Sequence, residues 1–209
     1  MKTTCIVAAA LASLACASAA QARTTTVAAG GSIQAAVDAA APGDTIVVRG
    51  THRENVAVGT DGITLRGLGA VLEPPAVPAA NACFDPTAEG ESVHGICVSG
   101  DIDFETGEIA RYVKGVLVTG FTVRGFTGNG ITAAAATGVT IAGNLAEGNG
   151  DGGIAAIAST AVRMRANRTA DNRFGVFVGG SLAGSVTGNS IHGNCVGIFV
   201  LGQPELPAG

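Results

Sequence analysis

The chain has 209 residues, of which 47% are hydrophobic, 13% are charged and 4% are aromatic, and its formal net charge is −4. It has no basic stripe, which argues against nucleic acid and against polyanionic membrane surfaces as partners. Its 32 glycines would suit a flexible low-complexity segment, but valine and isoleucine are too frequent and too regularly spaced for disorder, so short strands separated by glycine turns are favoured.

The N-terminal segment over residues 1–22 has the pattern of a signal peptide. The single cation Lys2 precedes an apolar run over residues 6–15 and a small-residue stretch that ends at Ala22, where we expect cleavage. No later stretch approaches the roughly 20 apolar residues of a membrane span. Cys16 would suit a lipoprotein, but Ser13 stands where a lipobox has leucine. The pattern therefore predicts a secreted, extracellular protein.

A short capping helix is predicted over residues 32–41, near the start of the mature chain. Ser32 is a good N-cap, and an apolar face that includes Ile33 and Val37 follows it, before Pro42 and Gly43 end the helix. Runs with strand character come next, over residues 45–49, 55–58 and 63–66. A helix in this place would cover the otherwise open first coil of a repetitive β-structure.

Three cysteines remain after the expected cleavage, in a compartment where disulfides persist. Cys83 and Cys97 are close in sequence and flank a polar segment, so we expect them to form a disulfide. Cys195 is then left over, which implies a free thiol, an intermolecular bond or a missing partner. The strand-like run 196–201 is followed by nothing that resembles a cap, and both features suggest a truncated chain.

Acidic residues alternate with apolar ones at Asp101, Asp103 and Glu105. Three carboxylates on one face could bind calcium or a cationic ligand. The segment lacks the glycine and terminal glutamate of an EF-hand loop, so a solvated protruding hairpin is favoured. The three histidines are isolated, so no histidine-based metal site is predicted, and calcium is the one cofactor we consider.

The strongest signal is a repeat that begins at Gly115 and gives three segments of equal length, 115–137, 138–160 and 161–183. Like residues fall on like when the segments are aligned, and the apolar column that begins at Ile131 continues as Ile154, Val176 and Ile198. Asparagine forms two further columns, the first at Asn144, Asn167 and Asn189 and the second at Asn149, Asn172 and Asn194.

The repeat length and content indicate a β-solenoid. Leucine-rich repeats can have a similar period but need a leucine signature that is absent, and each segment holds runs too short for a helix. The asparagines would form hydrogen-bonded ladders along the axis, or alternatively occupy left-handed turn positions. We therefore predict an all-β fold, a single-stranded right-handed parallel β-helix over residues 23–209, with about seven coils over residues 45–201.

The stretch 32–48, followed by Thr51, Arg53, Glu54, Asn55 and Val56, resembles the N-terminal signature of the pectin-lyase-like superfamily. The G-V-x-I-x-G-N pattern over residues 138–144 is similar to the parallel β-helix repeats of that superfamily. In style the chain is similar to exported actinobacterial proteins known only as right-handed parallel β-helix repeat proteins. The resemblance implies the fold and says little of function, because the superfamily includes lyases, hydrolases, esterases, epimerases and tailspikes.

None of the catalytic sets that this resemblance implies is recognisable. A lyase would need a calcium-binding carboxylate set with a basic residue, and a polygalacturonase-like site would need aspartates on successive coils, whereas no column here holds two. The epimerase-like Asp-Pro-His-Asp motif is absent, since Asp85 and Pro86 are followed by Thr87. The match to the pectin esterases stops at the N-terminal signature.

One column mixes charges, with Arg124, Glu147, Ala170 and His192 at the same repeat position. Arg124 and Glu147 would lie one coil apart and could form an exposed ion pair, whereas His192 would lie two coils from Glu147, too far for joint acid–base chemistry. We therefore favour the interpretation that this column is part of the solvated surface and has no catalytic role. The candidate catalytic residues are Arg124, Glu147, Arg163, Arg165, Asp171 and His192.

The leading hypothesis is an exported β-helix without a catalytic set, whose elongated face binds a polysaccharide or a cell-envelope glycan. A second hypothesis is a polysaccharide lyase or glycoside hydrolase whose site is completed beyond residue 209. A third, a metal-insertion protein, would need metal ligands that the sequence does not show. The exposed last strand edge also makes self-association through the C-terminal end an expectation.

Overall fold

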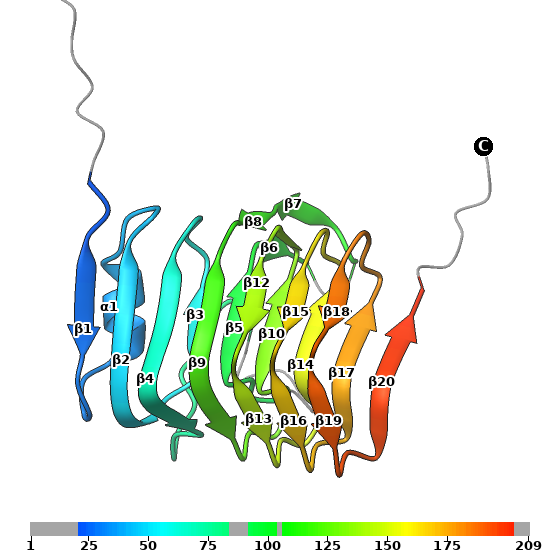
Figure 1. The fold of residues 1–209 in the computed structure, drawn as a ribbon. Coiled ribbons are helices and arrows are strands. Elements are labelled where there is room, and N and C mark those ends of the chain that lie inside the picture. Colours follow the sequence, from blue (N-terminus) through cyan, green and yellow to red (C-terminus); the bar gives the residue numbers. More distant parts are fainter. Residues whose placement is uncertain (1–20, 84–91, 104–105, 203–209) are drawn as a thin grey trace, which may run out of the picture.

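The computed structural model describes residues 21–83, 92–103 and 106–202, which wind into a parallel β-solenoid of about seven turns (Figure 1). The predicted fold class, a right-handed parallel β-helix, is confirmed. Residues 1–20, which hold most of the expected signal peptide and Cys16, lie outside the described part. No helix of the described residues is long and apolar enough to cross a membrane.

The larger sheet runs along one side of the solenoid with parallel pairing between neighbours. Its strands are, in spatial order, β1 (Thr24–Val27), β2 (Thr45–Arg53), β4 (Thr64–Glu73), β9 (Leu117–Arg124), β12 (Thr140–Ala142), β15 (Arg163–Arg165) and β18 (Ser185–Thr187). In the last three coils a second short strand continues this side, namely β13 (Leu145–Glu147), β16 (Arg168–Ala170) and β19 (Ser190–His192).

A second parallel sheet forms the opposite side of the core. Its strands are, in spatial order, β3 (Val56–Val58), β5 (Ile96–Ser99), β10 (Ile131–Ala134), β14 (Gly152–Ile157), β17 (Phe174–Gly179) and β20 (Val196–Leu201). Two small pairs complete the fold: the parallel strands β8 (Val113–Lys114) and β11 (Ala136–Thr137), and the antiparallel strands β6 (Asp101–Ile102) and β7 (Ile109–Arg111).

Apolar side chains at equal positions of successive coils stack into columns that form the core. On the larger sheet Leu65, Val118, Ile141 and Met164 are register partners from β4 to β15, and all are almost fully buried. Each coil thus covers the apolar surface that the coil before it leaves open, and burial of about 25 cal/mol per Å² drives this stacking.

The N-terminal end is closed by a strand as well as by the predicted helix. Helix α1 (Ile33–Asp38) begins at the predicted N-cap Ser32, whose Oγ accepts from the Ala35 N–H at 3.1 Å, and it ends before residue 41. The coils were expected to begin at residue 45, and this is wrong, because β1 precedes the helix and pairs in parallel with β2. A run of three threonines and one valine is too short to show periodicity, so its strand character appears only through pairing.

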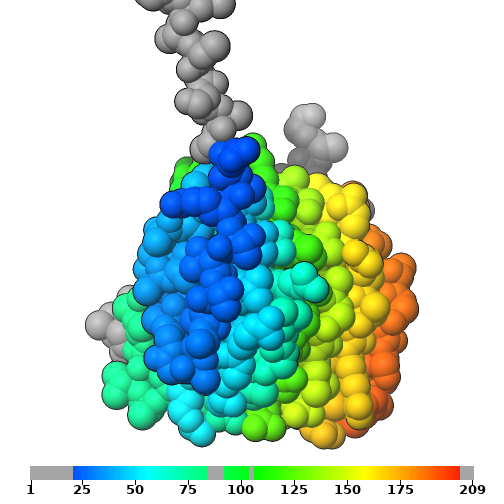
Figure 2. Space-filling model, turned by 60° about the vertical axis from the view of Figure 1, so that its left-hand side comes forward, coloured from blue at the N-terminus to red at the C-terminus, as the bar shows by residue number. Residues whose placement is uncertain are grey.

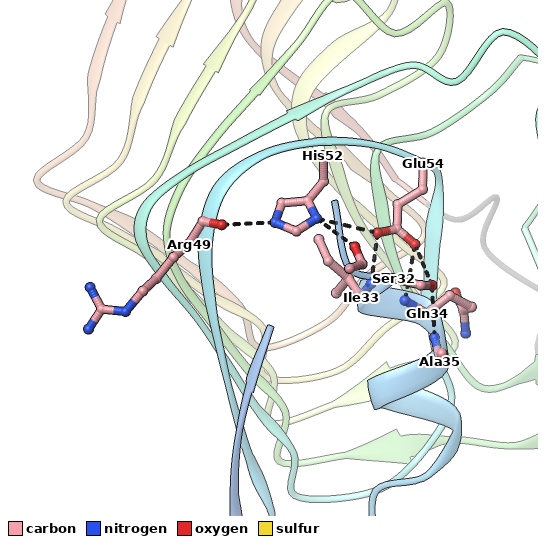
Figure 3. Close-up of polar contacts among 8 residues, drawn as sticks. Ser32, Ile33, Gln34, Ala35, Arg49, His52 and Glu54 are labelled. Atoms are coloured by element: carbon pink, nitrogen blue, oxygen red, sulfur yellow. Dashed lines mark hydrogen bonds and ion pairs between the residues drawn. The ribbon is translucent and has the colours of Figure 1, made fainter. Parts of the chain in front are cut away.

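Side chains satisfy the polar groups of this end. The Glu54 carboxylate accepts from the backbone N–H groups of Ile33 and Gln34, at 2.7 and 3.1 Å, and from the Ser32 hydroxyl (Figure 3). The Gln34 amide accepts from the Ala57 N–H at 2.8 Å and donates to the Ala57 carbonyl at 3.1 Å. Gln34 thus takes the place of a strand beside β3, which protects that edge.

Two other expectations concern the long excursion between β4 and β9. The predicted disulfide between Cys83 and Cys97 is formed, with 6.3 Å between the two Cα atoms, and it joins the loop after β4 to β5. The acidic segment forms the antiparallel hairpin of β6 and β7. Cys195 is a free, exposed cysteine directly before β20.

The asparagine columns form ladders along the axis. Asn144 donates from Nδ2 to Oδ1 of Asn167 at 3.1 Å, and Asn167 donates in the same way to Asn189 at 3.0 Å. The backbone N–H groups of Asn144 and Asn167 donate to the same oxygens. The left-handed turn position is filled instead by the residue before each asparagine, such as Ala166 with φ of 54°.

The second column repeats this arrangement through Asn149, Asn172 and Asn194. Both ladders begin on a phenylalanine, because the backbone N–H groups of Phe121 and Phe126 donate to the first asparagine of each column. The coil that lacks asparagine at these positions therefore still satisfies its backbone through the next coil.

Replacement of a middle rung tests the energetic weight of a ladder. Asn167→Ala removes the acceptor of the buried Asn144 N–H, so we expect a loss of about 2–4 kcal/mol in the free energy of unfolding. Asn189→Ala at the half-buried last rung is the matched control and should cost less than half as much. Chemical denaturation followed by circular dichroism measures both, and equal losses would contradict the ladder as a source of stability.

Candidate functional site

A row of charged side chains lies where the strands of the larger sheet end. Arg53 at the end of β2 is the register partner of Glu73 at the end of β4, and Arg124 at the end of β9 is the partner of Glu147 on β13. Because parallel strands end at the same edge, these residues succeed one another along that edge, and the ends of β4 and β9 lie at the lower side of the solenoid in Figure 1.

Glu73 is the centre of the row. Its carboxylate lies 2.7 Å from Arg53 Nη2 on one side and 2.7 Å from Arg124 Nη2 on the other, while its side chain is only 16% exposed. The hydrogen bond from Arg124 and the charge of Arg53 hold the pKa of Glu73 below its ordinary value. The carboxylate of Glu73 therefore fixes the positions of two guanidinium groups.

Two further carboxylates belong to the same region. Glu147 lies 4.0 Å from Arg124, the exposed ion pair that the repeat predicted, and is about one-third exposed. Asp171 holds the left-handed turn position before Asn172, with φ of 56°. Together they line a groove of about 460 Å³, whose residues are Arg53, Glu73, Pro74, Arg124, Gly125, Glu147, Gly148 and Asp171.

The structure brings only some of the candidate catalytic residues predicted from the sequence into the groove. Arg124, Glu147 and Asp171 line the groove. Arg163 and Arg165 are exposed on β15, on either side of the buried Met164, and point away from the core, outside the groove lining.

His192 is in the same row, one coil beyond Ala170, as the repeat predicted. Its Nε2 accepts a hydrogen bond from Arg168 Nε at 2.9 Å, so it contacts an arginine and not Glu147.

Sequence reasoning missed Arg53 and Glu73. Both are charged residues at the end of a strand-like run, a signal present in the sequence. The separation of Glu73 from Arg124 does not match the repeat length, however, because the excursion with the disulfide and the hairpin lies between them. Their place in the row is therefore visible only after the strands are paired.

The calcium candidates are engaged in other contacts. Asp101 pairs through both carboxylate oxygens with Arg111, at 3.1 and 3.3 Å. Asp103 accepts from the Thr106 N–H at 3.0 Å, and Glu105 lies outside the described residues. Within residues 21–83, 92–103 and 106–202, no three histidine, cysteine or acidic side chains are grouped so that they could hold a metal ion.

Comparisons with known proteins give one family and several distant structures. The family model described as the right handed beta helix region matches residues 75–206. No curated protein sequence matches the chain significantly.

The chain is similar in structure to the Family 28 exopolygalacturonase of Yersinia enterocolitica, with a TM-score of 0.43 and 14% identity over 83% of this chain and 56% of that one. A pectin methylesterase mutant in complex with a hexasaccharide gives a TM-score of 0.39 and 10% identity, over 78% of this chain and 66% of that one. The A-module of an Azotobacter vinelandii mannuronan C-5 epimerase gives a TM-score of 0.37 and 15% identity, over 88% of this chain and 56% of that one. The chain thus spans less than two thirds of each of these proteins.

The contacts of Glu73 predict a pH-dependent contribution to stability. A carboxyl whose pKa is lower in the folded chain stabilises the fold above its unfolded value, ordinarily 4.5, and loses that effect as the pH falls through the folded value. Glu73→Gln should therefore lower the melting temperature at neutral pH, and the difference from wild type should shrink as the pH falls below 4.5. Thermal unfolding across this range measures it.

Glu147→Gln is the matched control, because its carboxylate lies farther from Arg124, at 4.0 Å against 2.7 Å for Glu73. Its effect on the melting temperature at neutral pH should therefore be smaller. A difference between wild type and Glu73→Gln that stays constant down to acidic pH would show that the ion pairs of Glu73 do not stabilise the fold.

Proposed function

The chain belongs to the right-handed β-helix family, and from this premise we propose that it binds a neutral polysaccharide along the charged groove that Arg53, Glu73, Arg124, Glu147 and Asp171 line. The observation that carries the proposal is the row itself. Arg53, Glu73, Arg124 and Glu147 place planar guanidinium and carboxylate groups at one position of successive coils, with Asp171 beside them in the groove, and each group can form paired hydrogen bonds with the hydroxyls of a sugar.

The geometry of the row favours an extended chain over a compact ligand. Coils follow one another at about 4.8 Å, close to the length of one sugar residue in an extended polysaccharide. A glycan parallel to the axis would therefore meet one charged side chain of the row at each step from Arg53 to Glu147. The groove is an open one at a sheet edge, formed on rigid strands whose neighbours hold the side chains in place.

The charges of the groove favour a neutral glycan over a polyuronate. Two guanidinium groups face three carboxylates, and both guanidinium groups already contact Glu73 at 2.7 Å. Glu147, 4.0 Å from Arg124, and Asp171 are the carboxylates outside the close contacts of Glu73, so they can act as acceptors for the ligand and would repel an acidic chain.

An extracellular location fits this function. The disulfide between Cys83 and Cys97 is of a kind that persists in oxidising compartments. We propose that the N-terminal segment 1–22 directs export of the protein, which then meets its glycan outside the cell or at the cell envelope.

A second candidate, glycoside hydrolysis, is favoured by one observation. Glu147 and Asp171 line one groove from adjacent coils, and most glycosidases use a pair of carboxylates across the scissile bond.

Binding measurements on the purified chain test the leading proposal. Neutral glucans, mannans and xylans should bind, whereas polygalacturonate and alginate should not. Asp171→Asn suits the left-handed backbone and removes only the charge, so Asp171→Asn and Glu147→Gln should each weaken binding by about tenfold. Isothermal titration calorimetry measures the dissociation constants.

Asp101→Asn is the matched control and should leave binding unchanged, because Asp101 is on β6, outside the groove lining, and the β6–β7 hairpin lies at the upper side of the solenoid in Figure 1. A preference for acidic polysaccharides, or equal binding by wild type and all variants, would contradict the proposal. Release of new reducing ends by wild type, lost in both groove variants, would instead establish the hydrolase.

A further inference from the structure

His52 is a buried imidazole near the N-terminal end of the solenoid. Its side chain, which projects from β2, is only 1% exposed. β1, in blue in Figure 2, lies over this end, and the segment 28–32 that joins β1 to helix α1 passes beside the ring, where Gly31 contacts it. The imidazole therefore stands between β2 and the start of the helix.

Both ring nitrogens of His52 face backbone carbonyl oxygens. Nδ1 lies 2.9 Å from the carbonyl oxygen of Gly31, and Nε2 lies 3.1 Å from that of Arg49 (Figure 3). Arg49 stands at the bulge of β2, where it has no register partner on β4. A carbonyl oxygen can only accept a hydrogen bond, so each of the two ring nitrogens meets an acceptor.

The number of ring protons decides whether both contacts are hydrogen bonds. A neutral imidazole has one N–H group and one nitrogen with a lone pair. Whichever nitrogen of His52 carries the proton, the other would then turn its lone pair toward a carbonyl oxygen at hydrogen-bond distance. Only the imidazolium, with two N–H groups, donates to Gly31 and to Arg49 at the same time.

The charge nearest to the ring is negative. Glu54 Oε1 lies 3.8 Å from Nδ1. The guanidinium group of Arg49 points away from the ring in Figure 3, and that of Arg53 lies 2.7 Å from the carboxylate of Glu73. Because burial of a cation is costly unless an opposite charge accompanies it, the position of Glu54 favours the imidazolium.

The other elements around His52 add no positive charge. Residues 28–32 hold no ionisable side chain, and the register partner of His52 on β4 is Leu72. Asp38, the one ionisable residue of helix α1, accepts a hydrogen bond from Gln34 Nε2 at 2.8 Å. The two carbonyl groups and Glu54 are thus the polar surroundings that decide how many protons the ring holds.

We propose that His52 is a proton-dependent clamp of the N-terminal end. With two ring protons it joins the carbonyl groups of Gly31 and Arg49, and so holds the start of helix α1 against β2. Release of one proton to water breaks one of the two hydrogen bonds and loosens the segment 28–32. The clamp does not depend on whether the groove binds a glycan.

The direction of the pH effect follows from the acceptors. The folded chain offers two fixed acceptors and a nearby carboxylate to the protonated ring, whereas the unfolded chain offers water, so the second proton stabilises the fold. An imidazole in water takes up this proton at about pH 6.5, and carboxyls ordinarily titrate lower, at about pH 4.3. The contribution of His52 should therefore be present at about pH 6 and be lost as the pH rises toward about 8.

Nuclear magnetic resonance of the full chain, labelled with ¹⁵N in its histidine rings, tests the proton count directly. At about pH 6.5 an imidazole in water is half protonated. We expect both ring nitrogens of His52 to show the chemical shifts of fully protonated nitrogens at this pH. A spectrum with one protonated and one bare ring nitrogen would overturn the proposal.

Hydrogen exchange tests whether the proton holds the helix in place. The amides of Ile33 and Gln34, which donate to Glu54, report on opening of this end. Their protection factors, which are corrected for the intrinsic exchange rate, should fall by about fivefold or more between pH 6 and pH 8 in wild type. In His52→Gln they should be independent of pH, because an amide takes up no proton and donates to one carbonyl only.

His192→Gln is the matched control, because His192 is exposed on β19 and should leave the pH dependence of these amides unchanged. Equal pH dependence in wild type and His52→Gln would contradict the clamp. If His52→Gln does not fold, His94→Gln and His192→Gln assign the other two histidine rings, and the wild-type spectrum decides by itself.

Discussion

The hydrogen bonds between asparagines of successive coils satisfy groups that strand pairing cannot reach. A solenoid turns between its sheets, and the backbone N–H groups of these turns would be buried without partners, at about 1–3 kcal/mol each. Asn144, Asn167 and Asn189 resolve this by accepting from the coil before them. Register is thereby fixed in the coils from β9 onward, because a shift by one residue would break both ladders and the core columns.

The same register creates the groove. Glu73, Arg124 and Glu147 lie in one row only because each stands at the same step of its coil. Opposite charges at this repeat stabilise the surface without a dedicated loop, so the groove is as rigid as the strands beneath it. The proposed binding of a glycan along the axis would then need no closure and would cost little ordering of the protein.

How much the sequence predicts depends on how regular the spacing is. The asparagines of each column recur at nearly constant intervals, so their stacking, the fold and the pairing of Arg124 with Glu147 could be predicted. The excursion after β4 interrupts that spacing and hides the contact between Glu73 and Arg124. β1 was missed for a different reason, since so short a run carries no period and gains a structure only from β2.

The two ends of the solenoid differ because they solve one problem by different means. Each coil leaves apolar columns and backbone groups open to the next, so the first and last coils must be covered by something else. At the start, the hydrogen bonds of Gln34 to Ala57 and of Glu54 to Ile33 hold helix α1 against the first coils and cover that end with polar groups. At the end, Ile198 and Val200 remain as core residues without a covering coil in the described chain.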